Sequence, residues 1–192
     1  MAWPERLFRG TPRELNFYHL HLNKKELSEN PEKFRSMHKP GQKWLMGYSL
    51  PPFQRPVVWE EDRMVKFIES AVLGLHLGTW VYNASDKSDT KLGRVTMHIT
   101  DQWLIDGQQR LTALDRFFDD AFPVFGEKWS EVDKIRQRHF LMSTAFTAYE
   151  TRIEKVNELQ DLYNRLAFGG IPHTPADIAT DDAENLTVPG IR

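Results

Sequence analysis

Residues 103–112 read Trp103-Leu104-Ile105-Asp106-Gly107-Gln108-Gln109-Arg110-Leu111-Thr112. The apolar run at the start is typical of a buried strand, and the apolar spacing after Gly107 is typical of a helix. We therefore predict a strand over 102–105 and a helix from about 108 to 119. Asp106 and Gly107 would join the two elements in a tight turn, for which glycine has the necessary backbone freedom.

The side chains at this turn are suited to an anionic ligand. Where a strand runs directly into a helix, the first backbone N–H groups of the helix point outward and attract an anion. Arg110 can donate two hydrogen bonds to a phosphate, and Asp106 can hold Mg²⁺ or orient a water molecule. Gln108 and Gln109 can direct a water or contact a base edge. The spacing leaves an alternative open, in which Asp106 only caps the helix and the glutamines form a solvated first turn.

A second candidate segment precedes this one, with the sequence Leu50-Pro51-Pro52-Phe53-Gln54-Arg55-Pro56. Proline fits neither a helix interior nor a central strand, so we predict an extended, rigid loop here. A rigid loop lowers the entropy cost of holding Arg55 on a ligand. The alternative is that Arg55 pairs with an acid such as Asp106 or Glu60.

The remaining elements follow from hydrophobic periodicity and turn residues. Residues 15–22 could form a strand or a helix, and in a strand His19 and His21 would share one face. The other predictions are helices over about 60–75 and 154–167, strands over 79–82 and 94–99, a loop over 83–93, a helical segment over 127–138, a strand pair over 139–149, and a helix start at Thr174.

Composition narrows the class of protein. The chain has 192 residues, a net charge of -2 and no cysteine. Its length suits one domain, and neither a membrane-spanning run nor a signal peptide is expected. Without cysteine, disulfides, thiolate zinc sites and cysteine nucleophiles are excluded. Residues 1–60 carry an excess of basic side chains, which could face an anion such as DNA or form a solvated surface.

Three segments together resemble a known family: Tyr48–Trp59, Leu104–Thr112 and Tyr163–Thr174. They are similar to the ParB/sulfiredoxin-like superfamily. The closest branch is the uncharacterised domain at the N-terminus of GmrSD-type modification-dependent restriction enzymes, whose hallmark is Asp-Gly-Gln-Gln-Arg. The resemblance implies an α+β fold with a small mixed sheet and flanking helices. It divides the chain into an N-terminal extension (1–46), a ParB-like nucleotide-binding domain (47–178) and a flexible acidic tail (179–192).

The resemblance also implies a set of site residues. The catalytic set is Asp106, Gln108, Gln109 and Arg110, with Asp106 as the Mg²⁺ ligand. The nucleotide- or phosphate-binding set is Gln54, Arg55, Gly107, Arg110, Arg165, Gly169, Gly170 and His173. Ala167 stands where members of the branch usually carry asparagine.

The function that this resemblance implies is Mg²⁺-dependent binding and hydrolysis of a nucleoside triphosphate, in phage–host defence or nucleic-acid metabolism. In relatives, hydrolysis gates a separate nuclease domain, so the expected partners are a nucleoside triphosphate, DNA and a separate nuclease or effector subunit, with no membrane. The alternative is a nucleotide- or DNA-binding regulatory module without catalysis. No His-Asn-His nuclease pattern follows the motifs, so we expect no nuclease activity from this chain alone. We expect the protein in the cytoplasm of a bacterium, or of a host cell if it is a phage protein.

Overall fold

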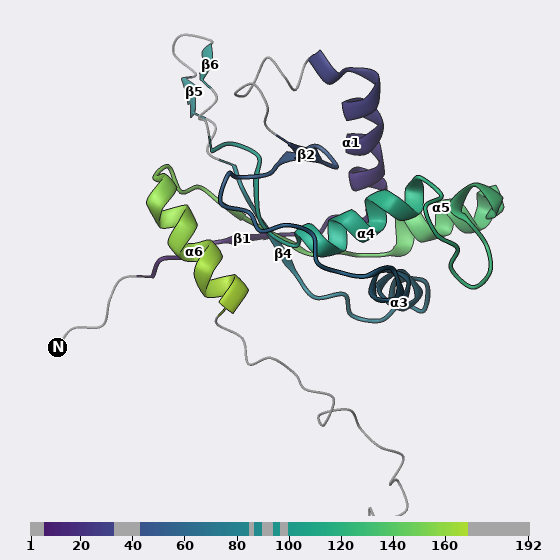
Figure 1. The fold of residues 1–192 in the computed structure, drawn as a ribbon. Coiled ribbons are helices and arrows are strands. Elements are labelled where there is room, and N and C mark those ends of the chain that lie inside the picture. The colour runs from purple at the N-terminus through teal and green to yellow at the C-terminus, as the bar shows by residue number, and fades with distance from the viewer. Residues whose placement is uncertain (1–5, 33–42, 85–86, 90–93, 97–99, 169–192) are drawn as a thin grey trace, which may run out of the picture.

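A six-stranded mixed sheet lies at the centre of the structure, between helices (Figure 1). This computed structural model describes residues 6–32, 43–84, 87–89, 94–96 and 100–168. The strand order is β1-β8-β4-β7-β3-β2. The strands are β1 (Thr11–Arg13), β2 (Trp44–Leu45), β3 (Tyr48–Ser49), β4 (Trp80–Asn83), β7 (Trp103–Asp106) and β8 (Ala148–Thr151). A separate antiparallel pair consists of β5 (Lys87–Asp89) and β6 (Arg94–Thr96).

Strand β7 is an inner strand of this sheet. It pairs antiparallel with β4 and parallel with β3. Its side chains alternate between two cores: Leu104 belongs to the larger one, whereas Trp103 and Ile105 belong to the smaller one. A strand covered on both faces is apolar throughout. This explains the unbroken apolar run that precedes Asp106.

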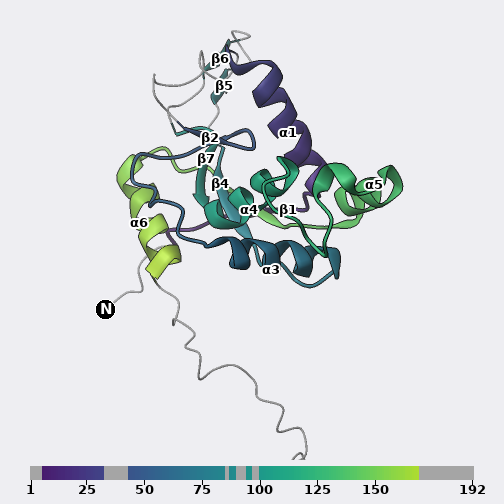
Figure 2. The ribbon, with the colours of Figure 1, turned by 45° about the vertical axis from the view of Figure 1, so that its right-hand side comes forward.

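The two cores lie on opposite faces of the sheet. Helix α6 (Val156–Phe168) packs against β7 and forms the smaller core with Leu159, Leu162 and Tyr163. Figure 2 shows α6 on one side of β4 and β7, with α1, α3, α4 and α5 beyond the other side. That larger layer contains α1 (Phe17–Glu29), α3 (Glu61–Val72), α4 (Gln108–Phe118), a 3-10 turn (Trp129–Glu131) and α5 (Lys134–Ser143).

The N-terminal segment is an integral part of this fold. Strand β1 pairs antiparallel with β8 at the sheet edge, and the side chain of Asn16 accepts a hydrogen bond from the His19 N–H to cap α1. Phe17 and Leu20 are completely buried. Residues 17–29 are therefore helical, and His19 and His21 do not share a strand face.

Most predicted elements are confirmed. The helices predicted over 60–75, 108–119 and 154–167 are α3, α4 and α6, and the strands at 79–82 and 102–105 are β4 and β7. The loop prediction for 83–93 was wrong at β5, which pairs with β6. The helical prediction for 127–138 holds for the 3-10 turn and for the start of α5, while residues 97–99 and Thr174 lie outside the described residues.

The strand pair predicted over 139–149 was wrong. Helix α5 continues to Ser143, and only β8 is a strand. The Asp133 side chain accepts hydrogen bonds from the N–H groups of Ile135 and Arg136, so the helix has a firm start. The alternation seen in the sequence is coincidental, because Phe140 is buried whereas Met142 is exposed.

Candidate functional site

The junction between β7 and α4 has the strand–turn–helix geometry that its sequence predicts. Gly107 is the N-cap residue of α4, with φ of 102°. A Cβ atom at this position would lie 2.6 Å from Cβ of Trp80 on β4. Glycine is therefore required here both by backbone conformation and by the close approach of the neighbouring strand. Among the described residues no side chain caps α4, so its first backbone N–H groups are available to a ligand.

A cavity of about 380 Å³ opens at this junction. Its volume lies in the range of small-molecule sites, roughly 300–1,000 Å³. The lining comes from the proline-rich loop, the start of α3, the β7–α4 junction and α6. The lining residues are Gln54, Arg55, Trp59, Arg63, Ile105, Asp106, Gly107, Gln108, Gln109, Arg110, Tyr163, Leu166 and Ala167.

Arg110 is held in place at the wall of this cavity. It donates to the Asp106 carboxylate at 2.8 Å and to the carbonyl of Leu77 at 3.3 Å. Its guanidinium also lies 5.7 Å from the ring centre of Phe146. The alternative in which Asp106 caps the helix does not describe the structure, because Asp106 pairs with Arg110 one turn later.

Gln109 is buried and uses both ends of its amide on the proline-rich loop. Its Oε1 accepts hydrogen bonds from the N–H groups of Val58 at 2.9 Å and Trp59 at 3.1 Å. Its Nε2 donates to the carbonyl of Pro56 at 3.3 Å. The amide therefore fixes the loop that carries Gln54 and Arg55 to the first turn of α4. This role as a clamp was not foreseen from the sequence.

Gln54 and Gln108 carry unsatisfied polar atoms at the same cavity. The Oε1 atom of each is buried and has no hydrogen-bond partner among the described residues. Buried polar groups are nearly always paired in folded proteins, so such atoms mark a place where a water or a ligand completes the bonding. Both side chains line the cavity, so a water or a ligand bound there would supply those donors.

Arg55 is exposed and lines the cavity from the proline-rich loop. Its backbone N–H donates to the hydroxyl of Tyr163 on α6 at 3.2 Å, which ties the loop to that helix. Within the part of the chain that the structure describes, its guanidinium forms no ion pair. The alternative in which Arg55 pairs with Asp106 or Glu60 is therefore not seen.

A comparison with protein-family models shows which family the chain belongs to. Residues 32–143 match the model described as the GmrSD restriction endonuclease, N-terminal domain. The chain belongs to this family. The match contains both the proline-rich loop and the β7–α4 junction. Comparisons with curated proteins and with solved structures gave no match.

The α+β fold with a mixed sheet is the one expected for a GmrSD N-terminal domain, and the resemblance noted from the motifs is confirmed. Helix α6 lies outside the matched residues, yet Tyr163, Leu166 and Ala167 complete the cavity wall. Trp59 and Arg63 also line it and were not predicted as site residues. The sequence alone carries no signal for Arg63, because its position depends on how the proline-rich loop folds against α4.

Some predicted site residues of this GmrSD domain are not brought to the cavity. Arg165 is 70% exposed and pairs with Asp161 at 3.0 Å, one turn earlier on α6. It does not line the cavity, although its neighbours Leu166 and Ala167 do. Gly169, Gly170 and His173 lie outside the described residues.

The donors for a metal ion are few in the described part of this GmrSD domain. No group of three or more His, Cys, Asp or Glu side chains there could hold a metal ion. Asp106 is the sole acidic residue of the described lining, and one of its oxygens is bound by Arg110. This donor set suits Mg²⁺ that arrives with a ligand's phosphates, because Mg²⁺ commonly takes one or two carboxylates and completes its shell with phosphate and water.

In the described residues no helix is long and apolar enough to cross a membrane.

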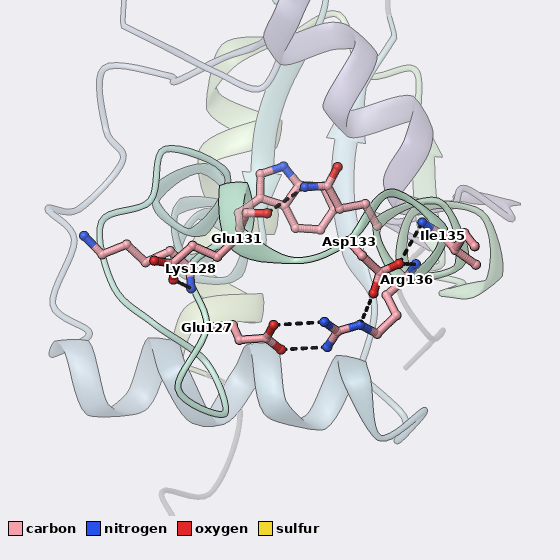
Figure 3. Close-up of polar contacts among 8 residues, drawn as sticks. Glu127, Lys128, Glu131, Asp133, Ile135 and Arg136 are labelled. Carbon is pink, nitrogen blue, oxygen red and sulfur yellow. Dashed lines mark hydrogen bonds and ion pairs between the residues drawn. The ribbon is translucent and has the colours of Figure 1, made fainter.

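A larger cavity of about 640 Å³ lies between the end of α3, the segment before the 3-10 turn, and α5. Its charged groups are already paired: Arg136 donates to Glu127 at 2.6 and 2.9 Å and also bonds Asp133 (Figure 3). The hydrogen bonds from Arg136 hold the pKa of Glu127 and of Asp133 below their usual values. Because these charges neutralise one another, this cavity is a poor site for an anion.

Proposed function

We propose that this GmrSD N-terminal domain binds a nucleoside triphosphate in the cavity at the β7–α4 junction and hydrolyses it. One observation carries the proposal: among the described residues, three arginines and a helix N-terminus without a side-chain cap line one cavity of about 380 Å³. The arginines are Arg55, Arg63 and Arg110, and Asp106 is the one carboxylate among the described lining residues. Guanidinium groups and helix N-termini are the preferred partners of phosphate.

The phosphate end of the ligand would lie against the start of α4. Here the backbone N–H groups of Gln108 and Gln109 and the guanidinium groups of Arg55 and Arg110 would donate hydrogen bonds to the phosphate oxygens. The nucleoside end carries hydroxyl and amino groups. These would supply the donor that Gln54 Oε1 lacks, whereas the attacking water would supply the one that Gln108 Oε1 lacks. A nucleotide together with the attacking water therefore offers partners both to the backbone N–H donors at the start of α4 and to the buried amide oxygens.

Asp106 is the residue that would hold Mg²⁺, through the carboxylate oxygen that Arg110 leaves free. When bound, Mg²⁺ neutralises charge that builds on the phosphates during transfer. In the hydrolytic step, a water oxygen forms a bond to the terminal phosphorus and the bond to the bridging oxygen breaks. The nucleoside diphosphate leaves, and the protons of the water pass to the inorganic phosphate and to solvent. Asp106 and the amide of Gln108 are the groups that would orient this water, and Arg110 and Arg55 would stabilise the developing negative charge.

Gln109 is no longer part of the proposed catalytic set. Both ends of its amide are engaged by the proline-rich loop, so it would support catalysis through the position of Arg55. This observation also favours the second candidate function, a nucleotide sensor without turnover. Two glutamines were expected to orient the water, and the amide of Gln109 is already bonded to the proline-rich loop. Ala167 at the cavity wall favours it too, since relatives usually carry asparagine there.

The matched family is a domain of restriction endonucleases, so we propose that this protein acts in defence against foreign DNA. In this account the nucleotide state of the domain controls a separate nuclease or effector, and DNA is the target of that partner. The proposed location is the cytoplasm, where nucleoside triphosphates and invading DNA are both present.

The test is thermal shift of the purified protein with ATP, GTP, CTP and UTP in the presence of Mg²⁺, with phosphate release measured in parallel. A higher melting temperature together with phosphate release would support the hydrolase if Asp106→Ala abolishes the release. A higher melting temperature without phosphate release would support the sensor. In the sensor case, Ala167→Asn should restore release if the missing asparagine is the cause. The absence of any shift would contradict both.

A further inference from the structure

Arg63 lies in the first turn of α3, outside the proline-rich loop and the Asp-Gly-Gln-Gln-Arg turn. Its guanidinium lies 4.7 Å from the ring centre of Trp59, and both residues line the cavity. A guanidinium that stacks on an aromatic ring presents its flat face to the ring and keeps its N–H edge free for hydrogen bonds. Trp59 therefore holds Arg63 in a defined position without using its donors.

The acidic side chains next to Arg63 in the first turn of α3 do not pair with it. The first turn of α3 carries Glu61 and Asp62, but Glu61 pairs with Arg116 at 3.2 Å. Among the described residues Arg63 itself forms no ion pair, as is also true of Arg55. Arg110, by contrast, is bound by Asp106. Of the three arginines in the described lining, Arg110 is paired, whereas Arg55 and Arg63 form no ion pair with another described residue.

We infer that Arg63 is a further phosphate-binding residue, which together with Arg55 makes the site select ligands with two or more linked phosphates over monophosphates. This inference rests on the proposed nucleotide site and adds its specificity. One guanidinium can fork to one phosphate group. Two arginines without an ion pair among the described residues, from two segments that line one cavity, are best satisfied by a chain of phosphates.

The test is calorimetric titration with inorganic tripolyphosphate, pyrophosphate and phosphate, and with ATP and AMP. These probes separate the phosphate chain from the nucleoside. The variants are Arg63→Ala and Arg63→Gln, with Arg138→Ala as the matched control, because Arg138 is exposed on α5 and lies outside this cavity. The melting temperature of each unliganded variant shows whether it is folded, and Arg63→Gln serves if Arg63→Ala is not.

We expect the Arg63 variants to bind tripolyphosphate and ATP at least roughly tenfold more weakly, which corresponds to one lost charge-assisted hydrogen bond of about 1.5 kcal/mol. Their affinity for AMP and inorganic phosphate should change less than about threefold, so the preference for the polyphosphate collapses. Arg138→Ala should bind all ligands as the wild-type protein does.

Two results would overturn the inference, and they differ in what else they contradict. If the wild-type protein binds ATP but the Arg63 variants keep its full preference over AMP, the role of Arg63 fails and the nucleotide site stands. If the wild-type protein binds neither nucleotides nor polyphosphates, the proposed function fails as well.

Discussion

Gln109 fixes the loop of Gln54 and Arg55 to helix α4 with three hydrogen bonds. We predict that Gln109→Ala lowers the free energy of unfolding by ~1–3 kcal/mol, because two backbone N–H groups and a carbonyl lose their partner. Hydrogen exchange should quicken at the amides of Val58 and Trp59. Gln160→Ala on the exposed face of α6 is the control. Unchanged exchange at residues 58 and 59 would contradict this role of the amide.

Gly107 offers a second test at the scale of single residues. Gly107→Ala should destabilise the protein in two ways, because φ is 102° and the added Cβ would meet Cβ of Trp80 at 2.6 Å. Gly74 is the matched control, since its φ is +72° and no atom of the described residues lies within 4 Å of an added Cβ. We expect Gly74→Ala to cost about 1–2 kcal/mol from the left-handed backbone alone, and Gly107→Ala to cost clearly more in chemical denaturation. Equal costs would show that β4 yields to the added methyl group.

At the scale of elements, β1 is joined to β8 by a buried carboxylate. Glu150 on β8 accepts hydrogen bonds from Arg13 on β1 at 3.0 Å, from Arg152 at 2.9 Å and from the Tyr82 hydroxyl at 3.2 Å. Burial alone would raise the pKa of Glu150, but the hydrogen bonds from Arg152 and Arg13 outweigh it and hold this pKa below its usual value. Burial, together with Glu150, raises the pKa of Tyr82 to about 12.

The lowered pKa of Glu150 predicts a pH dependence with a defined sign. A carboxyl whose pKa is lower in the folded state stabilises the protein above its unfolded pKa, and that contribution is lost as the pH falls through the folded pKa. We expect Glu150→Gln to be less stable than the wild-type protein by ~1–3 kcal/mol at pH 7. The difference should shrink below about pH 4. Urea denaturation from pH 7 to pH 3 checks this, with Glu69→Gln as the control. A difference that is independent of pH would mean that shape, not charge, explains the loss.

Some secondary-structure elements could be predicted from the sequence and others could not. The β7–α4 junction was predictable because one strand buried on both faces and one glycine turn determine it locally. The segment 139–149 was not, because Phe140 from a helix and Phe146 from a loop reach the same core. Their spacing imitates a strand although no strand connects them.

At the scale of the whole molecule, the cavity is assembled from segments far apart in the chain. The proline-rich loop and the α4 turn carry recognisable motifs, so most of the candidate site was predictable. Arg63 was not, because α3 alone is an amphipathic helix with a polar face that would ordinarily be solvated. Its place at the site follows only when the loop folds against α4 and brings Trp59 under the guanidinium. The clamp role of Gln109 depends on the same tertiary contact.

The central claim is that this assembled cavity is a nucleotide site, and its most direct test is a binding titration of the wild-type protein and Arg55→Ala with Mg²⁺ and each nucleoside triphosphate. Arg55 is the variant of choice because its guanidinium is exposed and forms no ion pair among the described residues, so its loss should leave the fold intact. Arg138→Ala again provides the control. The account predicts saturable one-site binding to the wild-type protein and to Arg138→Ala, and binding at least about tenfold weaker to a folded Arg55→Ala. Equal affinity of Arg55→Ala and the wild-type protein, or no binding of any nucleotide to the wild-type protein, would contradict it.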